Sequence, residues 1–249
     1  MVSTLTANSV LLLASNSEKK LKEMNKQLEG SGVTVLTLKD LDLPQADETG
    51  TTMAENASIK SEAAAAAVDM AAVADIVGRP VDKVVVVSED TGLEIPSLNN
   101  WPGPYFADLT ETAGGERDEM KGNQIVLDRM RGKQGDDRAA VFTSTLAVTE
   151  VTAAGVQGKP TLFTAGLEGK ITTRPEGRNG FGFDPIFAVT DAGYRGKTLA
   201  QIDTIGKAEL SPRTKALSDM VAALYPLPSA GPDQPGVDAG HEPRFGDAR

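Results

Sequence analysis

Apolar residues along the chain follow two spacings, one typical of strands and one typical of helices. Residues 10–14 form a short apolar run, and Leu21, Met24 and Leu28 then recur at helical spacing. Residues 83–87 are a continuous valine-rich run, the pattern of a strand covered on both faces. The same patterns predict further strands at 33–38, 139–149, 161–167 and 183–189, and further helices at 53–77, 116–130 and 213–224.

These elements predict a single folded unit. Helices and strands follow one another from residue 10 to residue 224 with no stretch typical of a linker, which favours one α/β domain over residues 1–225. Residues 96–115 are rich in proline and glycine and are expected to be mostly loop. Beyond Tyr225 there are too few large apolar residues to offset the entropy of ordering the chain. Residues 226–249 are therefore expected to form a flexible, acidic tail rich in proline and glycine.

The charge and the residue inventory narrow the range of functions. The formal net charge is -10, which argues against electrostatic binding to a nucleic-acid backbone. The chain has no cysteine, and its one histidine, His241, lies in the tail, which excludes disulfides, cysteine-based zinc sites and Ser-His-Asp triads. No apolar run approaches the roughly 20 residues of a membrane helix and no secretory signal is present, so we expect a cytoplasmic protein without a membrane partner. Carboxylates and lysines must carry any catalysis.

The first candidate site is segment 14–20, between the first strand and the first helix. Backbone amides at a helix N-terminus, small polar side chains and Lys20 together suit a phosphate group. Ser15 followed by Glu18 also has the form of a capping box, so an ordinary capped helix is the alternative interpretation.

The second candidate is the acidic segment 88–92, directly after the valine-rich strand. We expect a turn at the end of that strand, where Glu89 and Asp90 could hold Mg²⁺ through oxygen ligands and activate a water. Ligands in open α/β sheets bind at such strand ends. Acidic residues are also common turn formers, and the local pattern does not separate the two interpretations.

Two more segments pair cations with helix starts. Glu48 precedes a helix on which Asn56 and Lys60 are four residues apart and so share one face. Lys207 and Arg213 flank the start of the last predicted helix, where two cations suit phosphate oxygens. A solvated helix face and an ordinary helix start are the respective alternatives.

Segment 179–187 places two glycines between aromatic residues. Gly180 and Gly182 allow the backbone to approach a flat ligand closely, and Phe181 and Phe183 offer faces for stacking. A tight turn or a bulge that enters a strand would use the same residues. Both interpretations stay open on the local sequence.

Taken in order, these segments resemble the motifs of the inosine triphosphate pyrophosphatase family, over about residues 10–224. Segment 15–23 resembles the family's T/S-G/N-N-x-x-K-x-x-E, with Ser17 at the position of the second Asn. Segments 48–50 and 55–61 resemble its E-T-G and E-N-A-x-x-K-A stretches, and 89–93 its D/E-D-S/T-G-L motif. Residues 102–105 match P-G-x-Y, and 180–187 match G-F-G-Y-D-P-I-F with Phe183 in place of Tyr.

The resemblance implies a fold, a reaction and a set of site residues. The fold is an α/β one, an elongated mixed β-sheet flanked by helices in two lobes with a central nucleotide cleft. The reaction is Mg²⁺-dependent hydrolysis of non-canonical purine nucleoside triphosphates to monophosphate and pyrophosphate, which cleanses the nucleotide pool, and members are usually homodimers. Asp90 would be the general base and, with Glu48, a magnesium ligand. The residues implied to bind substrate are Ser15, Asn16, Ser17, Lys20, Lys60, Thr91, Phe181, Gly182, Phe183, Asp184, Lys207 and Arg213.

The chain departs from the family pattern at two positions. Pro212 stands where the family has a His associated with purine recognition, and a proline cannot donate a hydrogen bond. Asp108 follows P-G-x-Y where a basic residue is usual. Both departures bear on base selectivity. They leave two alternatives to the main interpretation, a catalytically silent nucleotide-binding relative and a Maf-type pyrophosphatase with a different base preference.

Overall fold

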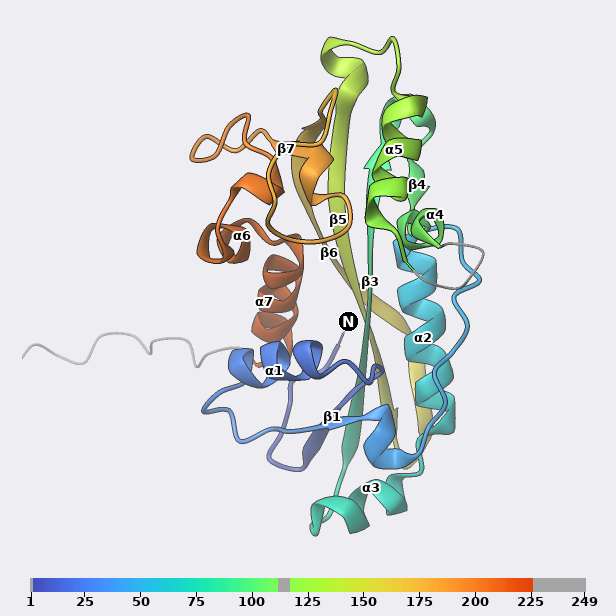
Figure 1. The fold of residues 1–249 in the computed structure, drawn as a ribbon. Coiled ribbons are helices and arrows are strands. Elements are labelled where there is room, and N and C mark those ends of the chain that lie inside the picture. Colours follow the sequence, from blue (N-terminus) through green and yellow to red (C-terminus); the bar gives the residue numbers. More distant parts are fainter. Residues whose placement is uncertain (1, 112–116, 226–249) are drawn as a thin grey trace, which may run out of the picture.

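The computed structural model describes residues 2–111 and 117–225, and within them one seven-stranded mixed sheet runs the length of the molecule (Figure 1). The strand order is β2-β1-β3-β5-β6-β7, with β4 paired beside one end of β3. The pairs β1/β2 and β1/β3 are parallel, and the other pairs are antiparallel. The strands are β1 (Ser9–Leu13), β2 (Thr34–Thr37), β3 (Lys83–Ile95), β4 (Trp101–Gly103), β5 (Ala139–Thr152), β6 (Gly155–Ile171) and β7 (Phe187–Val189).

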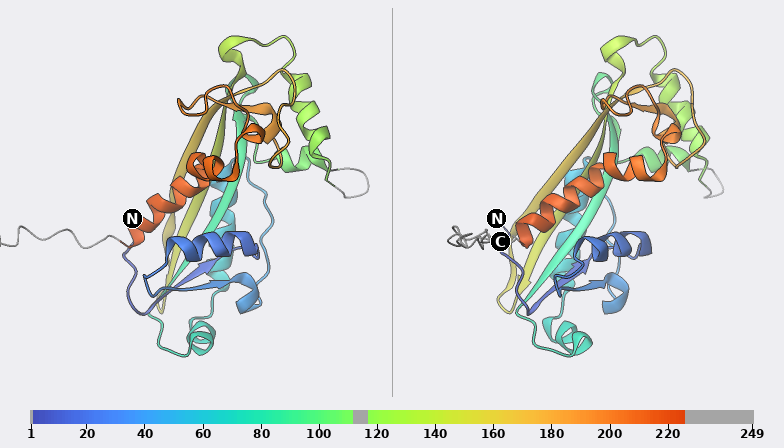
Figure 2. Two further views of the ribbon diagram at one scale, coloured as in Figure 1. Left: turned by 60° about the vertical axis from the view of Figure 1, so that its left-hand side comes forward. Right: turned by 90° about the vertical axis from the view of Figure 1, so that its left-hand side faces the viewer.

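Helices cover both faces of this sheet. Helices α1 and α7 lie together on one face, whereas α2 lies along the other, as Figures 1 and 2 show. The helices are α1 (Glu18–Gln27), α2 (Met53–Ala67), α3 (Met70–Val77), α4 (Phe106–Thr110), α5 (Glu119–Arg129), α6 (Thr204–Leu210) and α7 (Pro212–Leu224). The elongated mixed sheet flanked by helices confirms the expected fold class.

The alternation of side chains in β3 decides which face each residue serves. Val85 and Val87 belong to the core beneath α1 and α7, whereas Val84 and Val86 belong to the core beneath α2 and α3. Successive side chains of a strand point to opposite faces, so this register continues along β3. A third core surrounds Leu93 and gives the other end of the sheet its own lobe, with α4, α5 and β7.

Segment 88–92 is not a turn, contrary to the expectation from sequence. Strand β3 continues without interruption through these residues to Ile95, and each of them pairs with β5. The polar residues are accommodated because buried partners meet their side chains. For example, the Ser88 hydroxyl donates to the Ala57 carbonyl of α2.

Three other expectations about local structure were wrong. The alanine-rich stretch 53–77 is two helices, because Val68 is extended and the Asp69 side chain caps α3 by accepting from the amides of Ala71 and Ala72. The strand expected from residue 183 begins only at Phe187, after a short 3₁₀ turn. Segment 96–115 was expected to be mostly loop, but its described part, 96–111, contains a 3₁₀ turn, β4 and α4. In addition, α6 forms where no helix was predicted.

Some of the expectations from the sequence concern residues that the structure does not describe. The tail at 226–249 and residues 112–116 lie beyond the described ranges. In the ranges 2–111 and 117–225, the helices are all too short or too polar to cross a bilayer.

Candidate active site

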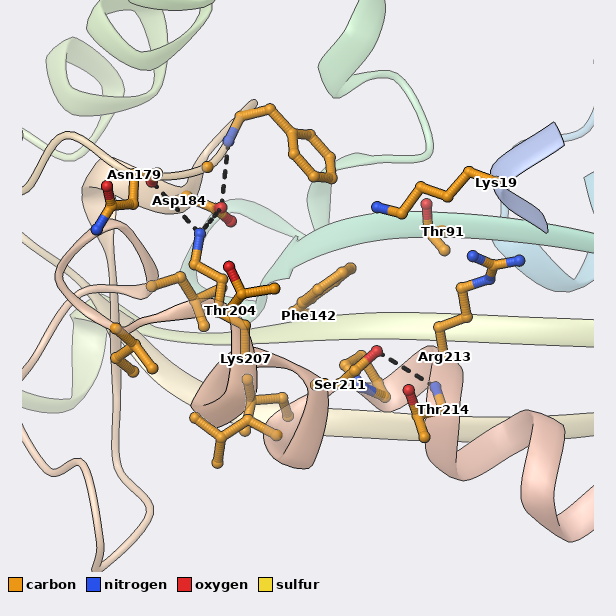
Figure 3. A pocket seen from close by; sticks show the side chains of 18 of the residues that line it. Lys19, Thr91, Phe142, Asn179, Asp184, Thr204, Lys207, Ser211, Arg213 and Thr214 are labelled. Carbon is orange, nitrogen blue, oxygen red and sulfur yellow. Dashed lines mark hydrogen bonds and ion pairs between the residues drawn. The ribbon is translucent and has the colours of Figure 1, made fainter. Parts of the chain in front are cut away.

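A cleft of about 910 Å³ opens on the face of the sheet that carries α1 and α7 (Figure 3). Its walls come from the N-terminal turn of α1, the middle of β3, the loop at 178–184, and the stretch from α6 into α7. Figure 3 shows Lys207 and Asp184 at one end and Lys19 and Arg213 at the other. Of the residues expected to bind substrate, seven line this cleft: Ser17, Lys20, Thr91, Phe181, Asp184, Lys207 and Arg213.

The loop before α1 brings a helix N-terminus to the cleft. Ser17 is the N-cap, and its hydroxyl accepts from the Lys20 amide at 3.4 Å. The Ser15 hydroxyl accepts from the Ser17 amide at 3.2 Å, so Ser15 does not cap the helix as the sequence suggested. Asn16 turns away and accepts from the Lys39 amide at 3.0 Å. Ser15 and Asn16 do not line the cleft but fix the loop that does.

The Glu89 side chain extends from β3 on this face of the sheet. It pairs with Lys20 and Arg213, two of the residues expected to bind phosphate. Its Oε2 lies 3.3 Å from Lys20 Nζ and 2.8 Å from Arg213 Nε, although that N–H does not point along the line to the oxygen. Its Oε1 accepts from the Ser144 hydroxyl at 3.3 Å. The Glu89 side chain is 2% exposed, so this carboxylate is held almost wholly by its partners. Arg213 also pairs with Glu23.

Asp90 points to the opposite face, toward α2. Its Oδ1 lies 3.3 Å from Lys60 Nζ, and its Oδ2 accepts from Asn56 Nδ2 at 3.2 Å. Lys60 Nζ also lies 2.7 Å from Glu48 Oε1, so one ammonium joins the two carboxylates expected to bind metal. Asp90, Glu48 and Lys60 thus form a second cluster that does not line the cleft.

Burial sets the protonation of Asp90. Removal of the carboxyl from water raises its pKa above the usual range for aspartate. The positive charge of Lys60 opposes this rise, and the negative charge of Glu48 adds to it. Hydrogen bonds from Asn56 and Lys60 favour the ionised form. The net effect is a carboxylate that takes up a proton more readily than an exposed aspartate would.

The ion pairs of Glu89 and those of Asp90 lie on opposite faces of the same stretch of β3. One edge of this stretch has no neighbouring strand in the described part of the chain. Strand β1 pairs with β3 only as far as Val87, and β4 pairs with it only from Leu93. Between them, residues 88–92 pair with β5 on one side and, in the described part of the chain, with no strand on the other. The Ala14 amide donates to the Val87 carbonyl, so the loop before α1 begins at this opening. Glu89 and Thr91 of this stretch line the cleft, and Asp90 between them faces α2.

Glu48 and Asp90 are a suitable pair of ligands for magnesium. Mg²⁺ prefers hard oxygen ligands and is usually held by one or two carboxylates together with substrate phosphates and waters. The two carboxylates already share a cation, the Lys60 ammonium, and the Glu48 side chain is 44% exposed. Within residues 2–111 and 117–225, no three acidic, histidine or cysteine side chains gather to hold a metal on their own. The site therefore suits an ion that completes its coordination with substrate oxygens.

The loop at 178–184 forms the far end of the cleft. Lys207 Nζ donates to Asp184 Oδ2 at 2.6 Å and to the Asn179 carbonyl at 3.3 Å, and the Phe181 amide donates to the same carboxylate oxygen at 3.2 Å. Gly180, with φ +97°, leaves no room for a Cβ beside Asp184 and Lys207. This network holds the Phe181 ring at the rim, 66% exposed, with Lys19 Nζ 5.3 Å from its centroid.

Gly182 and Phe183 do not lie in the wall of the cleft. Phe183 packs edge-on against Phe106 and Phe142, with ring centroids 5.2 and 5.0 Å apart, and so supports the loop from beneath. The Gly182 carbonyl accepts from Asn123 Nδ2 at 3.0 Å. Neither residue lines the cleft, because the loop turns Phe183 toward the third core, around Leu93.

The two departures from the family pattern lie in different places. Pro212 is the first residue of α7, is buried, and lines the cleft beside Arg213. Asp108 is exposed on α4 and does not line it. Only Pro212 is placed to affect a ligand in the cleft directly.

The local pattern paired Glu89 with Asp90 as carboxylates for Mg²⁺, but the two side chains lie on opposite faces of β3 and have different partners. Sequence reasoning gave Asn56 no role beyond sharing a helix face with Lys60, whereas its side chain bonds to Asp90. If 88–92 had been predicted as a strand, the alternation of side chains would have placed Glu89 and Asp90 on opposite faces of the sheet. The partners of Glu89 are 69 positions before and 124 positions after it in the sequence, so no local pattern reveals them.

Comparison with known proteins gives a consistent result. The sequence model of the Ham1 family matches residues 11–223. A dITP/XTP pyrophosphatase of Mycolicibacterium paratuberculosis is 36% identical over 229 residues, which cover 89% of this chain and 98% of the relative. Two solved structures share the fold: a HAM1 protein from Coxiella burnetii (TM-score 0.70, 29% identity, 86% of this chain and 98% of the other) and the Ham1 protein of Staphylococcus aureus (TM-score 0.67, 27% identity, 86% and 96%).

Proposed function

The chain belongs to the Ham1 family, and from this premise we propose that it hydrolyses nucleoside triphosphates to the monophosphate and pyrophosphate. The observation that carries the proposal is the unpaired edge of β3 at 88–92, with a cleft that contains Lys20 and Arg213 on one face and the Asp90 cluster on the other. The relative from Mycolicibacterium paratuberculosis is named a dITP/XTP pyrophosphatase, which supports non-canonical purine nucleotides as the substrate class and nucleotide-pool cleansing as the role.

The cations of the cleft would hold the triphosphate. Lys20 and Arg213 lie together on Glu89, and Ser17 presents the N-terminus of α1, whose amides and dipole favour an anion. Thr91 is exposed in the same wall. On the other face, Lys60 stands beside Asp90. A phosphate chain at the opening would thus meet positive charge from both sides of β3.

The far end of the cleft would hold the base and sugar. Phe181 offers an exposed ring for stacking, and Asp184 and Lys207 fix the loop that carries it. Gly182 and Phe183 would act from behind, by shaping that loop. Ser15 and Asn16 would likewise support the phosphate end without touching it.

Asp90 is the residue we assign as general base. A water that attacks the α-phosphorus must lose a proton as its oxygen forms the new bond and pyrophosphate leaves. A carboxylate with a raised pKa accepts that proton more readily than an exposed one. Glu48 and Asp90 would hold Mg²⁺, which when bound neutralises charge on the phosphate oxygens. Lys60 would keep Asp90 ionised in the resting enzyme.

Two alternatives make different predictions. A catalytically silent relative would bind nucleotide in the cleft and release no pyrophosphate. A Maf-type pyrophosphatase would release pyrophosphate but prefer other bases, and Pro212 in the cleft is the observation that keeps this alternative open. The homodimer and the cytoplasmic location inferred from the sequence stay predictions.

The test is a panel of canonical and modified nucleoside triphosphates, assayed for pyrophosphate with and without Mg²⁺. We expect hydrolysis of inosine and xanthosine triphosphates and its loss in Asp90→Asn. Asp137→Asn, a change in the remote 3₁₀ turn 135–138, is the matched control and should keep full activity. Wild-type turnover by Asp90→Asn would show that another group is the base, and thermal stabilisation by nucleotide without pyrophosphate would favour the silent relative.

A further inference from the structure

Two hydrogen bonds hold the backbone amide and carbonyl of Gly50, together the Gly50 peptide. Its amide donates to Asn56 Oδ1 at 2.8 Å, and its carbonyl accepts from the Tyr105 hydroxyl at 2.7 Å. A Cβ added at Gly50 would lie 2.6 Å from the Glu55 Cβ and 2.8 Å from Asn56 Oδ1, so this approach requires glycine. The two hydrogen bonds come from distant segments, the first turns of α2 and the loop after β4.

Asn56 links this peptide to β3. Its Oδ1 accepts from Gly50, while its Nδ2 donates to Asp90 Oδ2 at 3.2 Å. Asn56 is 1% exposed, so both ends of its amide are committed to these partners. One buried side chain therefore sets the distance between the Gly50 peptide and the Asp90 carboxylate.

Glu48 depends on this link for its position. It lies two residues before Gly50, in the stretch 43–50, which has no regular secondary structure. The Glu48 side chain is 44% exposed and pairs with Lys60. The first fixed point of the backbone after Glu48 is the Gly50 peptide. The position of the Gly50 backbone therefore constrains where Glu48 lies relative to Asp90, in addition to the Lys60 ammonium that contacts both carboxylates.

We propose that Asn56 and Tyr105 are positioning residues, which set the spacing of Glu48 and Asp90 by holding the Gly50 peptide between them. This inference rests on the proposed function, in which those two carboxylates share a magnesium ion. Neither residue touches substrate in this arrangement. Groups that orient metal ligands in this way commonly change metal affinity by roughly 10–100-fold when removed.

The sharpest variant is Tyr105→Phe, which removes one hydroxyl and keeps the ring. We expect the Mg²⁺ concentration for half-maximal hydrolysis to rise about tenfold, with little change in KM for nucleotide at saturating Mg²⁺. Binding of Mn²⁺, followed by EPR in the presence of a non-hydrolysable triphosphate analogue, should weaken by a similar factor. Tyr194→Phe is the matched control, because it removes a hydroxyl that bonds to Glu209 outside the cleft.

A second readout does not depend on catalysis. Hydrogen exchange at the Gly50 amide should quicken in Tyr105→Phe and in Asn56→Ala, and stay unchanged in Tyr194→Phe. If the wild-type protein hydrolyses no triphosphate, the proposed function fails, and exchange at Gly50 still decides whether the two side chains hold the peptide. If the wild type is active and Tyr105→Phe keeps both its Mg²⁺ dependence and its exchange rate, the positioning role is overturned.

Discussion

Glu89 and Asp90 are adjacent in β3, yet their carboxylates lie on opposite faces of the sheet and have no charged partner in common. Glu89 is bound by Lys20 and Arg213 beneath α1 and α7, and Asp90 by Lys60 beneath α2. One carboxylate compensates cations that we assign to phosphate binding, and the other is free to act as a base. We therefore assign the adjacent acids separate roles.

This separation predicts opposite effects on stability. Glu89→Gln should lower the free energy of unfolding by about 1–3 kcal/mol, because two partly buried cations lose a charged partner. Asp90→Asn should leave it unchanged or raise it at neutral pH. A carboxyl with a raised folded pKa destabilises the folded state once ionised, so stability falls as pH rises from the unfolded pKa to the folded one.

Urea denaturation at several pH values measures both effects. The difference between Asp90→Asn and the wild type should be small well below the usual aspartate pKa of about 3.9 and reach its full size above the raised pKa of Asp90. A loss of stability in Asp90→Asn as large as that in Glu89→Gln would contradict the assignment of separate roles.

The pKa of Asp90 should respond in opposite directions to its two charged neighbours. Lys60→Met removes the positive charge that lowers the pKa, so the pKa should rise further. Glu48→Gln removes the negative charge that raises it, so the pKa should fall. Titration of the Asp90 carboxyl carbon by ¹³C NMR in metal-free protein measures both shifts. If neither variant shifts the pKa, burial alone governs this group.

The sequence allowed the strands near 10–14, 83–87 and 139–149 to be predicted, because most of their residues are apolar. It failed at 88–92, where local polarity suggests a turn. Those residues remain in the sheet because β5 pairs with every one of them and residues of α2 bond to the Ser88 and Asp90 side chains. Pairing across about 55 residues is a property of the fold, and the local composition does not contain it.

The candidate site divides in the same way. The motifs identified Lys20, Lys60, Asp90, Lys207 and Arg213, and the structure brings each of them to the cleft or to the Asp90 cluster. The sequence could not reveal that Phe183 turns into the aromatic core while Phe181 stays at the rim, because the two positive-φ glycines reverse the loop between them. Alternation of glycine and phenylalanine specifies a turn but not which ring faces outward.

Lys207 should be needed for order in the loop that carries Phe181. Lys207→Met leaves the Asp184 carboxylate, 11% exposed, without its cation and frees the Asn179 carbonyl. We expect the KM for nucleotide to rise about tenfold, with a loss of about 1–3 kcal/mol in stability. Steady-state kinetics and hydrogen exchange of peptides over 178–186 measure these effects.

Lys197→Met is the control for this prediction, because Lys197 is exposed and does not line the cleft. Exchange in 178–186 that matches the wild type in Lys207→Met would show that the aromatic core beneath Phe183 holds the loop without help from this ion pair.

Base selectivity should change at Pro212. This residue lines the cleft at the first position of α7, where a proline removes no intrahelical hydrogen bond and other residues also fit. Pro212→His would add a side-chain donor to a wall of the cleft that has none at this position. A site that gains a donor for a substrate carbonyl discriminates against bases without one, so the ratio of kcat/KM for inosine over adenosine triphosphate should rise at least about tenfold.

Pro212→Ala separates the imidazole from the loss of the ring, because it restores a backbone amide without adding a side-chain donor. It should leave the inosine-to-adenosine ratio near that of the wild type. If both variants shift the ratio equally, the backbone at the start of α7 reads the base. If neither variant shifts the ratio, selectivity lies with the residues of the 178–184 loop, and Pro212 only stabilises the start of α7.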